Sequence, residues 1–205
     1  MKPSILYKIV RLIAMPVLKI LYRYEIKGAD SLPRSGRVIV CCNHMSLMDC
    51  VLVVIAQKRQ VRFMAKKELF DNRLLGWILH KVGAFPVERG KGDTTAISVA
   101  ESILNSEEVL GIFIEGTRSK DGNLLRPKSG AAMIALHTDS PVLPMCITCP
   151  DGGRIAPFKK VIVSCGDIIS VDELKSESDS KAKVRSATRL IMDRIKDMRE
   201  KDLKK

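Results

Sequence analysis

Apolar residues follow two patterns in this chain, and the patterns alternate along most of its length. Short runs rich in Val, Ile and Cys are typical of buried strands, and apolar residues three or four apart are typical of helices. The strand pattern falls at 24–27, 37–42, 61–65, 84–88, 109–115, 142–148 and 160–165. The helical pattern falls at 47–57, 74–82, 94–104 and 130–137. This alternation predicts an α/β fold: a single domain with a mixed, mostly parallel sheet flanked by helices.

The two ends of the chain also carry helical patterns. At the C-terminal end, residues 174–205 show one apolar stripe, which predicts an ordinary packed helix. At the N-terminal end, residues 4–23 have a broad apolar face and a narrower basic stripe. The stripe consists of Lys8, Arg11, Lys19 and Arg23. Pro16 should kink this helix or split it in two.

The N-terminal pattern predicts a helix that lies in a membrane interface with its cations toward anionic headgroups. Its uncharged stretches are far too short to span a bilayer. The alternative is a helix that packs on the protein core and leaves its basic face in water. We expect the first case, and we therefore divide the chain into a membrane-associated segment at 1–23 and one domain at 24–205.

Charge and cysteine content narrow the classes of partner. The formal net charge is +12, and half of it lies in residues 1–37. Such a chain binds nucleic acid, anionic membranes or anionic substrates. No nucleic-acid-binding motif is present, so we expect no nucleic acid partner. The six cysteines form no usual disulfide framework, and the lone Cys146-x-x-Cys149 pair lies in an apolar run, so we predict buried thiols and no metal site.

The first polar motif that can carry chemistry follows the strand pattern at 37–42. It reads Asn43-His44, with Asp49 five residues after the histidine. A histidine just past a buried strand lies where open α/β sheets place their ligands. A nearby carboxylate can orient the ring and stabilise its protonated form, as in a Ser-His-Asp triad. Alone the pattern is weak, because a surface histidine with an ordinary hydrogen bond would look the same.

Two further motifs follow later strand patterns. Arg89 stands in a glycine-flanked loop after 84–88 and can bring a guanidinium to a phosphate. The third motif is Glu115-Gly116-Thr117-Arg118-Ser119, after the run that begins at 109. In it Arg118 can bind phosphate through two hydrogen bonds, the glycine allows close approach, and the hydroxyl groups can donate. Taken singly, the second motif could be a solvated arginine in a turn and the third a capped surface loop. Three such motifs in order, each after a strand pattern, argue against coincidence.

These residues resemble the glycerolipid acyltransferase family over about residues 24–165. The family's NHxxxxD, GxxxxxR and FxEGTRS motifs and its apolar proline motif stand here at 43–49, 83–89, 113–119 and 142–144. Residues 65–70 resemble the family's lysine segment. The resemblance implies His44 as the general base and Asp49 as its partner. It implies substrate binding by the following residues: Lys66, Arg89, Glu115, Gly116, Thr117 and Arg118.

The implied reaction moves an acyl group from acyl-CoA or acyl carrier protein to the sn-2 hydroxyl of lysophosphatidate, giving phosphatidate for phospholipid biosynthesis. No metal or other cofactor is implied. The expected location is the cytoplasmic face of the cell membrane, with the enzyme bound to the surface. Other acceptors remain open: glycerol 3-phosphate, a lysophospholipid or an ornithine lipid. A noncatalytic basic membrane-binding protein is the alternative from a different class, and the intact His44 and Asp49 argue against it.

Overall fold

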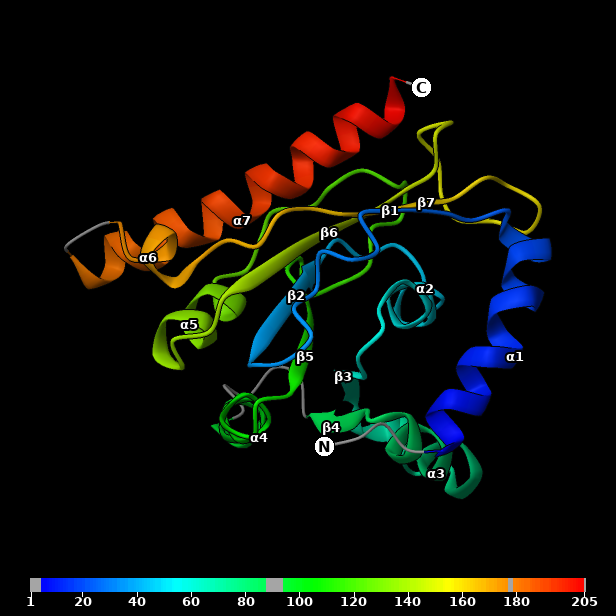
Figure 1. The fold of residues 1–205 in the computed structure, drawn as a ribbon, viewed down its shortest axis with the longest axis horizontal. Helices are drawn as coiled ribbons and strands as arrows, with labels where there is room; N and C mark the ends of the chain where they lie inside the picture. Colours follow the sequence, from blue (N-terminus) through cyan, green and yellow to red (C-terminus); the bar gives the residue numbers. More distant parts are fainter. Residues whose placement is uncertain (1–4, 88–93, 177–178, 205) are drawn as a thin grey trace.

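A seven-stranded sheet forms the centre of the structure, with helices packed on both of its faces (Figure 1). The computed structural model describes residues 5–87, 94–176 and 179–204. The strands are β1 (Glu25–Lys27), β2 (Val38–Cys42), β3 (Val61–Lys66), β4 (Phe85–Val87), β5 (Val109–Phe113), β6 (Val142–Thr148) and β7 (Ile162–Cys165). The helices are α1 (Ile5–Tyr22), α2 (Asp49–Ala56), the 3-10 helix η1 (Lys67–Leu69), α3 (Arg73–Val82), α4 (Thr94–Asn105), α5 (Gly130–His137), α6 (Val171–Leu174) and α7 (Ser180–Leu203).

The order of strands across the sheet is β1-β7-β6-β2-β5-β3-β4. All neighbours pair in parallel except β6 and β7, which are antiparallel. The carboxyl ends of β2 to β6 therefore meet at one edge of the sheet, which we call the carboxyl edge. The predicted fold class, a mixed and mostly parallel sheet flanked by helices, is confirmed.

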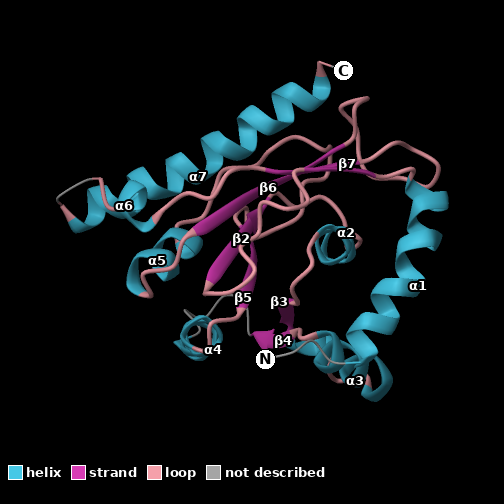
Figure 2. Cartoon of the chain, viewed as in Figure 1, coloured by secondary structure: helices cyan, strands magenta, loops and turns pink. Residues whose placement is uncertain are grey.

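Strand β2 shows why the pattern of residues leads to this arrangement. It pairs with β5 on one side and β6 on the other, and all five of its residues are buried. Its side chains alternate between the faces, with Val40 in one core and Ile39 in the other. Helices α1 and α2 cover the first face, and α4, α5 and α7 cover the second (Figure 2). A strand covered on both faces has no polar face, which explains its unbroken apolar run.

The predicted elements differ from the observed ones mainly at their ends. The strand expected at 109–115 ends at Phe113, because Gly116 adopts a φ of +67° and its N–H donates to the Phe113 carbonyl over 3.0 Å. That turn lifts Glu115 off the sheet at the carboxyl edge. The helix expected at 4–23 is observed as one element, Ile5–Tyr22, that runs through Pro16, so of the two expected outcomes, a kink or a split, the split does not occur. Pro16 lies on the exposed side of the helix.

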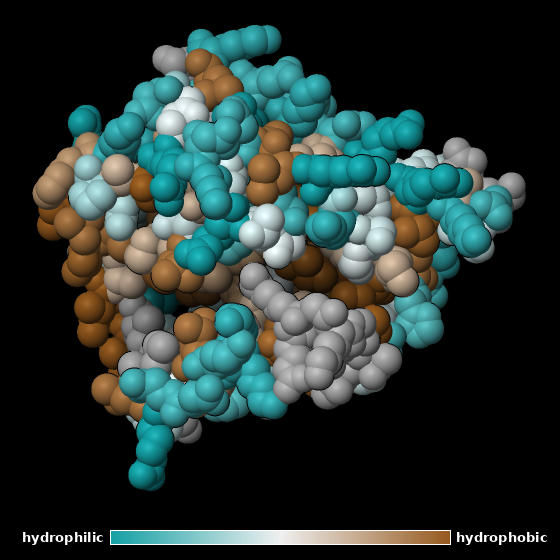
Figure 3. Space-filling model, turned by 180° about the vertical axis from the view of Figure 1, so that it is seen from behind, coloured by the Kyte–Doolittle hydropathy of each residue, from teal (hydrophilic) through white to brown (hydrophobic). Residues whose placement is uncertain are grey.

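The orientation of α1 differs from the expected one. Its outward side is apolar, with Ile5, Leu12 and Ile20 between 71% and 78% exposed (Figure 3). Arg11 instead turns inward, and its Nη2 donates to the Ile55 carbonyl over 3.2 Å. Lys19 donates to a carbonyl oxygen just beyond the helix. Arg11 therefore turns away from the outward direction expected for the basic stripe, because a backbone carbonyl of the protein supplies its acceptor, while Lys19 stays exposed.

Helix α1 also packs against its neighbours, through the buried side chains of Tyr7 and Leu18 and through contacts with α2 and α3. Its outward apolar side adjoins α3, where Leu74 is 70% and Trp77 is 53% exposed. Within the residues described, no helix is both long and apolar enough to cross a bilayer.

Candidate active site

His44 and Asp49 form a hydrogen-bonded pair at the carboxyl edge of the sheet, just beyond β2. The imidazole Nδ1 lies 2.7 Å from Asp49 Oδ2. Asp49 is the first residue of α2 and is fully buried, while His44 retains 7% of its exposure. The helix start thus places the carboxylate directly behind the ring. The sequence spacing alone suggested this pair, and the structure brings the two side chains together.

The surroundings of Asp49 fix the tautomer of the histidine. Its Oδ2 also accepts from the backbone N–H of Met45, over 2.6 Å, and of Ser46, over 2.8 Å. An oxygen that receives these two donors is arranged as an acceptor, so the Nδ1–H of His44 donates to it. The other ring nitrogen, Nε2, is then the one with a free lone pair. The pair has the arrangement that a general base requires.

An aromatic ring holds the imidazole from one face. Phe113, the last residue of β5, stacks on His44 with ring centroids 3.9 Å apart and planes 11° from parallel. Phe63 stacks in turn on Phe113 at 5.4 Å. Strands β3, β5 and the turn after β2 thus fix the orientation of the ring together. A base held in one orientation can meet a reacting hydroxyl without first losing rotational freedom.

Glu115 lies beneath this site and is only 1% exposed. Its Oε1 accepts from the Leu125 N–H over 3.2 Å, and its Oε2 is buried with no hydrogen-bond partner among the described residues. Burial raises the pKa of Glu115 to about 7, and the backbone N–H groups of Leu125 and His44 lower it by less. The carboxyl group therefore lies inside the protein, under the loops that carry the other motif residues.

An apolar cavity of about 370 Å³ opens beside His44. Residues of β3, β4, β5 and the start of α5 line it, and Gly116 and Lys128 lie on its rim. It is the size of a small-molecule site, and His44 lines it. Lys128 was not among the residues singled out from the sequence, since it follows no strand pattern.

A second cavity, of about 430 Å³, lies between the turns that follow β2, β5 and β6. We call it the basic cavity. Thr117 and Arg118 line it as the sequence suggested, together with Lys120 and Arg154. Within the part of the chain that the structure describes, its three cations have no acidic partner. Such a cavity is suited to an anion, and Arg118 and Arg154 can each offer a fork of N–H donors.

Lys66, which was expected in the site, lines neither of these cavities. Lys66 ends β3 at the carboxyl edge, but its Nζ pairs with Glu68 Oε1 at 2.8 Å and is about half exposed. Arg89 falls within 88–93, outside the residues that the structure describes. Gly116 lines the apolar cavity, and the next residue, Thr117, lines the basic cavity. The positive φ of Gly116 is a conformation that glycine adopts without strain.

The cysteines are placed in the core. Cys146 and Cys149 are both buried, and burial raises the pKa of Cys146 to about 12 and that of Cys149 to about 11. Cys146 Sγ lies 3.3 Å from Thr148 Oγ1. Over the described ranges, no three His, Cys, Asp or Glu side chains gather as a candidate metal site.

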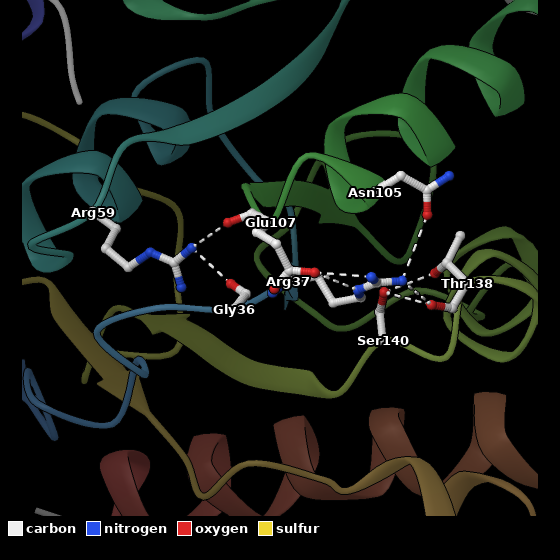
Figure 4. Close-up of polar contacts among 7 residues, drawn as sticks. All are labelled: Gly36, Arg37, Arg59, Asn105, Glu107, Thr138 and Ser140. Atoms are coloured by element: carbon white, nitrogen blue, oxygen red, sulfur yellow. Dashed lines mark hydrogen bonds and ion pairs between the residues drawn. The ribbon is translucent and has the colours of Figure 1, made fainter. Parts of the chain in front are cut away.

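A larger cavity, of about 530 Å³, lies at the opposite, amino edge of the sheet. Arg59, which lines it, and the neighbouring Arg37 are engaged by the protein itself (Figure 4). Arg59 donates to the carbonyl oxygens of Pro33, Gly36 and Glu107, and Arg37 forms an ion pair with Glu107 at 2.8 Å. These bonds tie the loops before β2 and β5 together. We therefore regard this cavity as a structural junction and the carboxyl edge as the site.

Comparisons with known proteins identify relatives of the chain. A sequence model described as Acyltransferase matches residues 23–148. The 1-acyl-sn-glycerol-3-phosphate acyltransferase of Bacillus subtilis (strain 168) is 29% identical over 183 residues, which are 86% of this chain and 88% of that protein. Its counterpart in Streptococcus pneumoniae is 31% identical over 156 residues, and the match spans 74% of this chain and 58% of that protein.

A solved structure shares the fold. The 1-acyl-sn-glycerophosphate acyltransferase of Thermotoga maritima superposes with a TM-score of 0.71, covering 94% of this chain and 79% of that one. The sequence identity is 23%. This likeness extends the common architecture beyond residues 23–148, to most of the chain.

Proposed function

The chain belongs to the acyltransferase family, and we propose that it transfers a fatty acyl group from a thioester donor to the sn-2 hydroxyl of 1-acyl-glycerol-3-phosphate. The product is phosphatidate, a precursor in phospholipid biosynthesis. The relatives that bear this name align over most of the chain. The observation that carries the proposal is the buried His44–Asp49 pair between an apolar cavity and a basic one.

The chemistry starts at His44. With Nδ1–H bonded to Asp49, Nε2 takes the proton of the acceptor hydroxyl as its oxygen attacks the thioester carbonyl. The new C–O bond forms, the tetrahedral intermediate collapses, and the C–S bond breaks. The imidazolium returns the proton to the departing thiolate. Asp49 stabilises the imidazolium while it exists, and no acyl-enzyme is required.

The two cavities suit the two ends of the reacting pair. The basic cavity suits the phosphate of the acceptor, because Arg118 can bind it through two charge-assisted hydrogen bonds while Thr117 donates a third. The apolar cavity suits the acyl group of the donor, because apolar side chains of the sheet and of α5 line it. His44 lies where the hydroxyl and the thioester would meet. From the sequence motif, Arg89 supplies further positive charge for the phosphate, whereas Lys66 pairs with Glu68 and lines neither cavity.

Glu115 supports this arrangement from below. Its buried carboxyl contacts the loop after β5 and lies near the His44 backbone, so it acts on the position of the site. The sequence motif suggested direct substrate binding, and in our proposal Glu115 reaches the substrate only through the loops it holds.

The acceptor is a lipid, which requires contact with a membrane surface. We propose that the outward apolar side of α1, together with Leu74 and Trp77 of α3, inserts into the interfacial region on the cytoplasmic face of the membrane. Lys8 and Arg23, both exposed, remain available to anionic headgroups. The protein is then bound at the surface, without a span.

Acyl transfer by the purified full-length chain tests the proposal. The acyl donor is radiolabelled acyl-CoA or radiolabelled acyl-loaded carrier protein. The acceptor is lysophosphatidate, glycerol 3-phosphate, lysophosphatidylcholine or a lyso-ornithine lipid. We expect phosphatidate from lysophosphatidate, and no product with His44→Ala. If another acceptor were turned over faster, that acceptor would take the place of lysophosphatidate in the proposal. If no acceptor were acylated, the proposal of an enzymatic function would be wrong.

A further inference from the structure

The loop after β6 carries an arginine that none of the sequence motifs includes. Arg154 lies beyond residues 23–148, the span that the family model matches. It is exposed, and it lines the basic cavity with Arg118 and Lys120. Strand β6 is the neighbour of β2 on the side away from β5, so its loop approaches the site from a direction that the motif residues do not cover.

Contacts within the loop of Arg154, and between it and the loop of Arg118, fix its position. Asp151 forms an ion pair with Lys159 at 2.5 Å and accepts from the Gly153 N–H over 3.0 Å. A Cβ on Gly122 would lie 2.5 Å from the Gly153 carbonyl oxygen, so the two loops meet backbone to backbone. Gly122 itself adopts a φ of +86°, which glycine adopts without strain.

The C-terminal helix secures the same junction. Arg199 of α7 donates to the Gly122 carbonyl over 3.0 Å, and the Gly122 N–H donates to Ser119 Oγ over 3.1 Å. Ser119 directly follows Arg118. The chain of contacts from Arg199 through Gly122 to the loop of Arg154 therefore holds both arginines against one cavity.

A phosphate monoester makes a demand that Arg118, the one motif arginine among the described residues that line the basic cavity, does not meet alone. It carries about −1.5 to −2 charges near pH 7 and has three acceptor oxygens. One guanidinium supplies a single positive charge and engages two of those oxygens. Resting on the function proposed above, we propose that Arg154 binds the phosphate of the acceptor together with Arg118, so that guanidinium groups from two loops hold the dianion between them.

The test is steady-state kinetics of the full-length protein with lysophosphatidate and with 1-acylglycerol, which has the same hydroxyl and no phosphate. Arg154→Ala should lower kcat/KM for lysophosphatidate about ten- to hundredfold, mostly through the acceptor KM. The donor KM and the rate with 1-acylglycerol should change little. Arg154→Lys keeps the positive charge but cannot form two parallel hydrogen bonds to the phosphate. Its kcat/KM for lysophosphatidate should therefore lie between that of the wild type and that of Arg154→Ala.

Arg34→Ala is the matched control, because it removes one exposed arginine at the amino edge, away from the basic cavity. It should leave the preference for lysophosphatidate over 1-acylglycerol unchanged. An unchanged preference in Arg154→Ala would overturn the inference, as would a rise confined to the KM of acyl-CoA. Absence of acyl transfer in the wild-type protein would instead count against the proposed function.

Discussion

The backbone N–H of Ser119 donates to the carbonyl oxygen of His44 over 2.8 Å. This bond joins the turn after β2 to the turn after β5, beyond the last paired residues of the two strands. His44, the proposed base, and the loop of Arg118 therefore share one backbone junction. A substitution in either turn can thus shift the other.

The first prediction concerns the base. His44→Ala should fold and lose about 10²- to 10⁴-fold in kcat, the range typical for loss of a positioned base. Asp49→Asn should lose a similar amount. An amide oxygen in the place of Oδ2 can still accept from the Met45 and Ser46 N–H groups and from His44 Nδ1–H, but the amide carries no negative charge to stabilise the imidazolium.

Radiolabelled acyl transfer measures the loss, and circular dichroism melting curves report on the fold. If His44→Ala kept more than half of the wild-type turnover with an unchanged melting curve, another group would have to be the base.

The second prediction concerns phosphate binding by the motif arginines. Arg118→Ala should raise the KM for lysophosphatidate, since a charge-assisted hydrogen bond contributes about 1.5–3 kcal/mol. Arg118→Lys should restore little, because lysine cannot form the bidentate contact. Arg89→Ala should act in the same direction. Kinetics with each substrate varied in turn check this, and an unchanged acceptor KM and kcat in both alanine variants would remove these arginines from the phosphate site.

The third prediction is a pH dependence of stability from Glu115. Its pKa is raised by burial from 4.5 to about 7 in the folded protein. Between these values the folded protein holds a proton that the unfolded chain has released, so the free energy of unfolding falls as the pH rises. The loss is on the order of 3 kcal/mol and is complete above pH 7.

Glu115→Gln keeps an oxygen for the Leu125 N–H and cannot ionise. Urea denaturation at several pH values should show its stability rising relative to wild type from pH 4.5 to 7. A difference that stays constant across this range would mean that the carboxyl group does not titrate there.

The fourth prediction concerns membrane attachment. Leu12→Gln with Ile20→Gln should weaken binding to anionic vesicles at least tenfold, because each apolar side chain contributes about 1.5–3 kcal/mol when it leaves water. Both side chains are more than 70% exposed, so the fold should not change. Arg11→Gln should instead lower the melting temperature, because Arg11 donates to the Ile55 carbonyl.

Sedimentation with vesicles measures the binding. Ile97→Gln with Met133→Gln is the matched control, since these exposed apolar residues lie on α4 and α5. Should the α1 variant sediment as well as this control, the membrane contact would have to lie on another surface.

The sequence predicted those features that depend on local spacing. His44 and Asp49 are five residues apart on a turn that enters a helix, so short-range geometry decides their contact. The strand at 142–148 and the helix at 130–137 have the expected bounds, because strong apolar patterns and turns delimit them.

Features that depend on long-range packing could not be predicted in this way. Glu115 ends the strand expected at 109–115 and begins a motif read as substrate-binding or as a capped surface loop, yet it is buried and bonded to the N–H of Leu125. The inward turn of Arg11 depends on a carbonyl oxygen 44 residues away in the chain. Arg154 had one local signal, since an arginine beside two glycines follows a strand, as Arg118 does after its glycine.

The junction at the amino edge separates two requirements of the protein in space. Arg59 and Glu107 join the loops at the amino ends of the strands. The proposed reacting groups lie at the carboxyl ends of the strands. Directed evolution for heat tolerance can therefore act on the loops at the amino edge. Turnover and acceptor choice can be changed separately, by substitutions at the carboxyl edge. The two ends of the sheet can serve as independent targets for combinatorial libraries, with little epistasis between them.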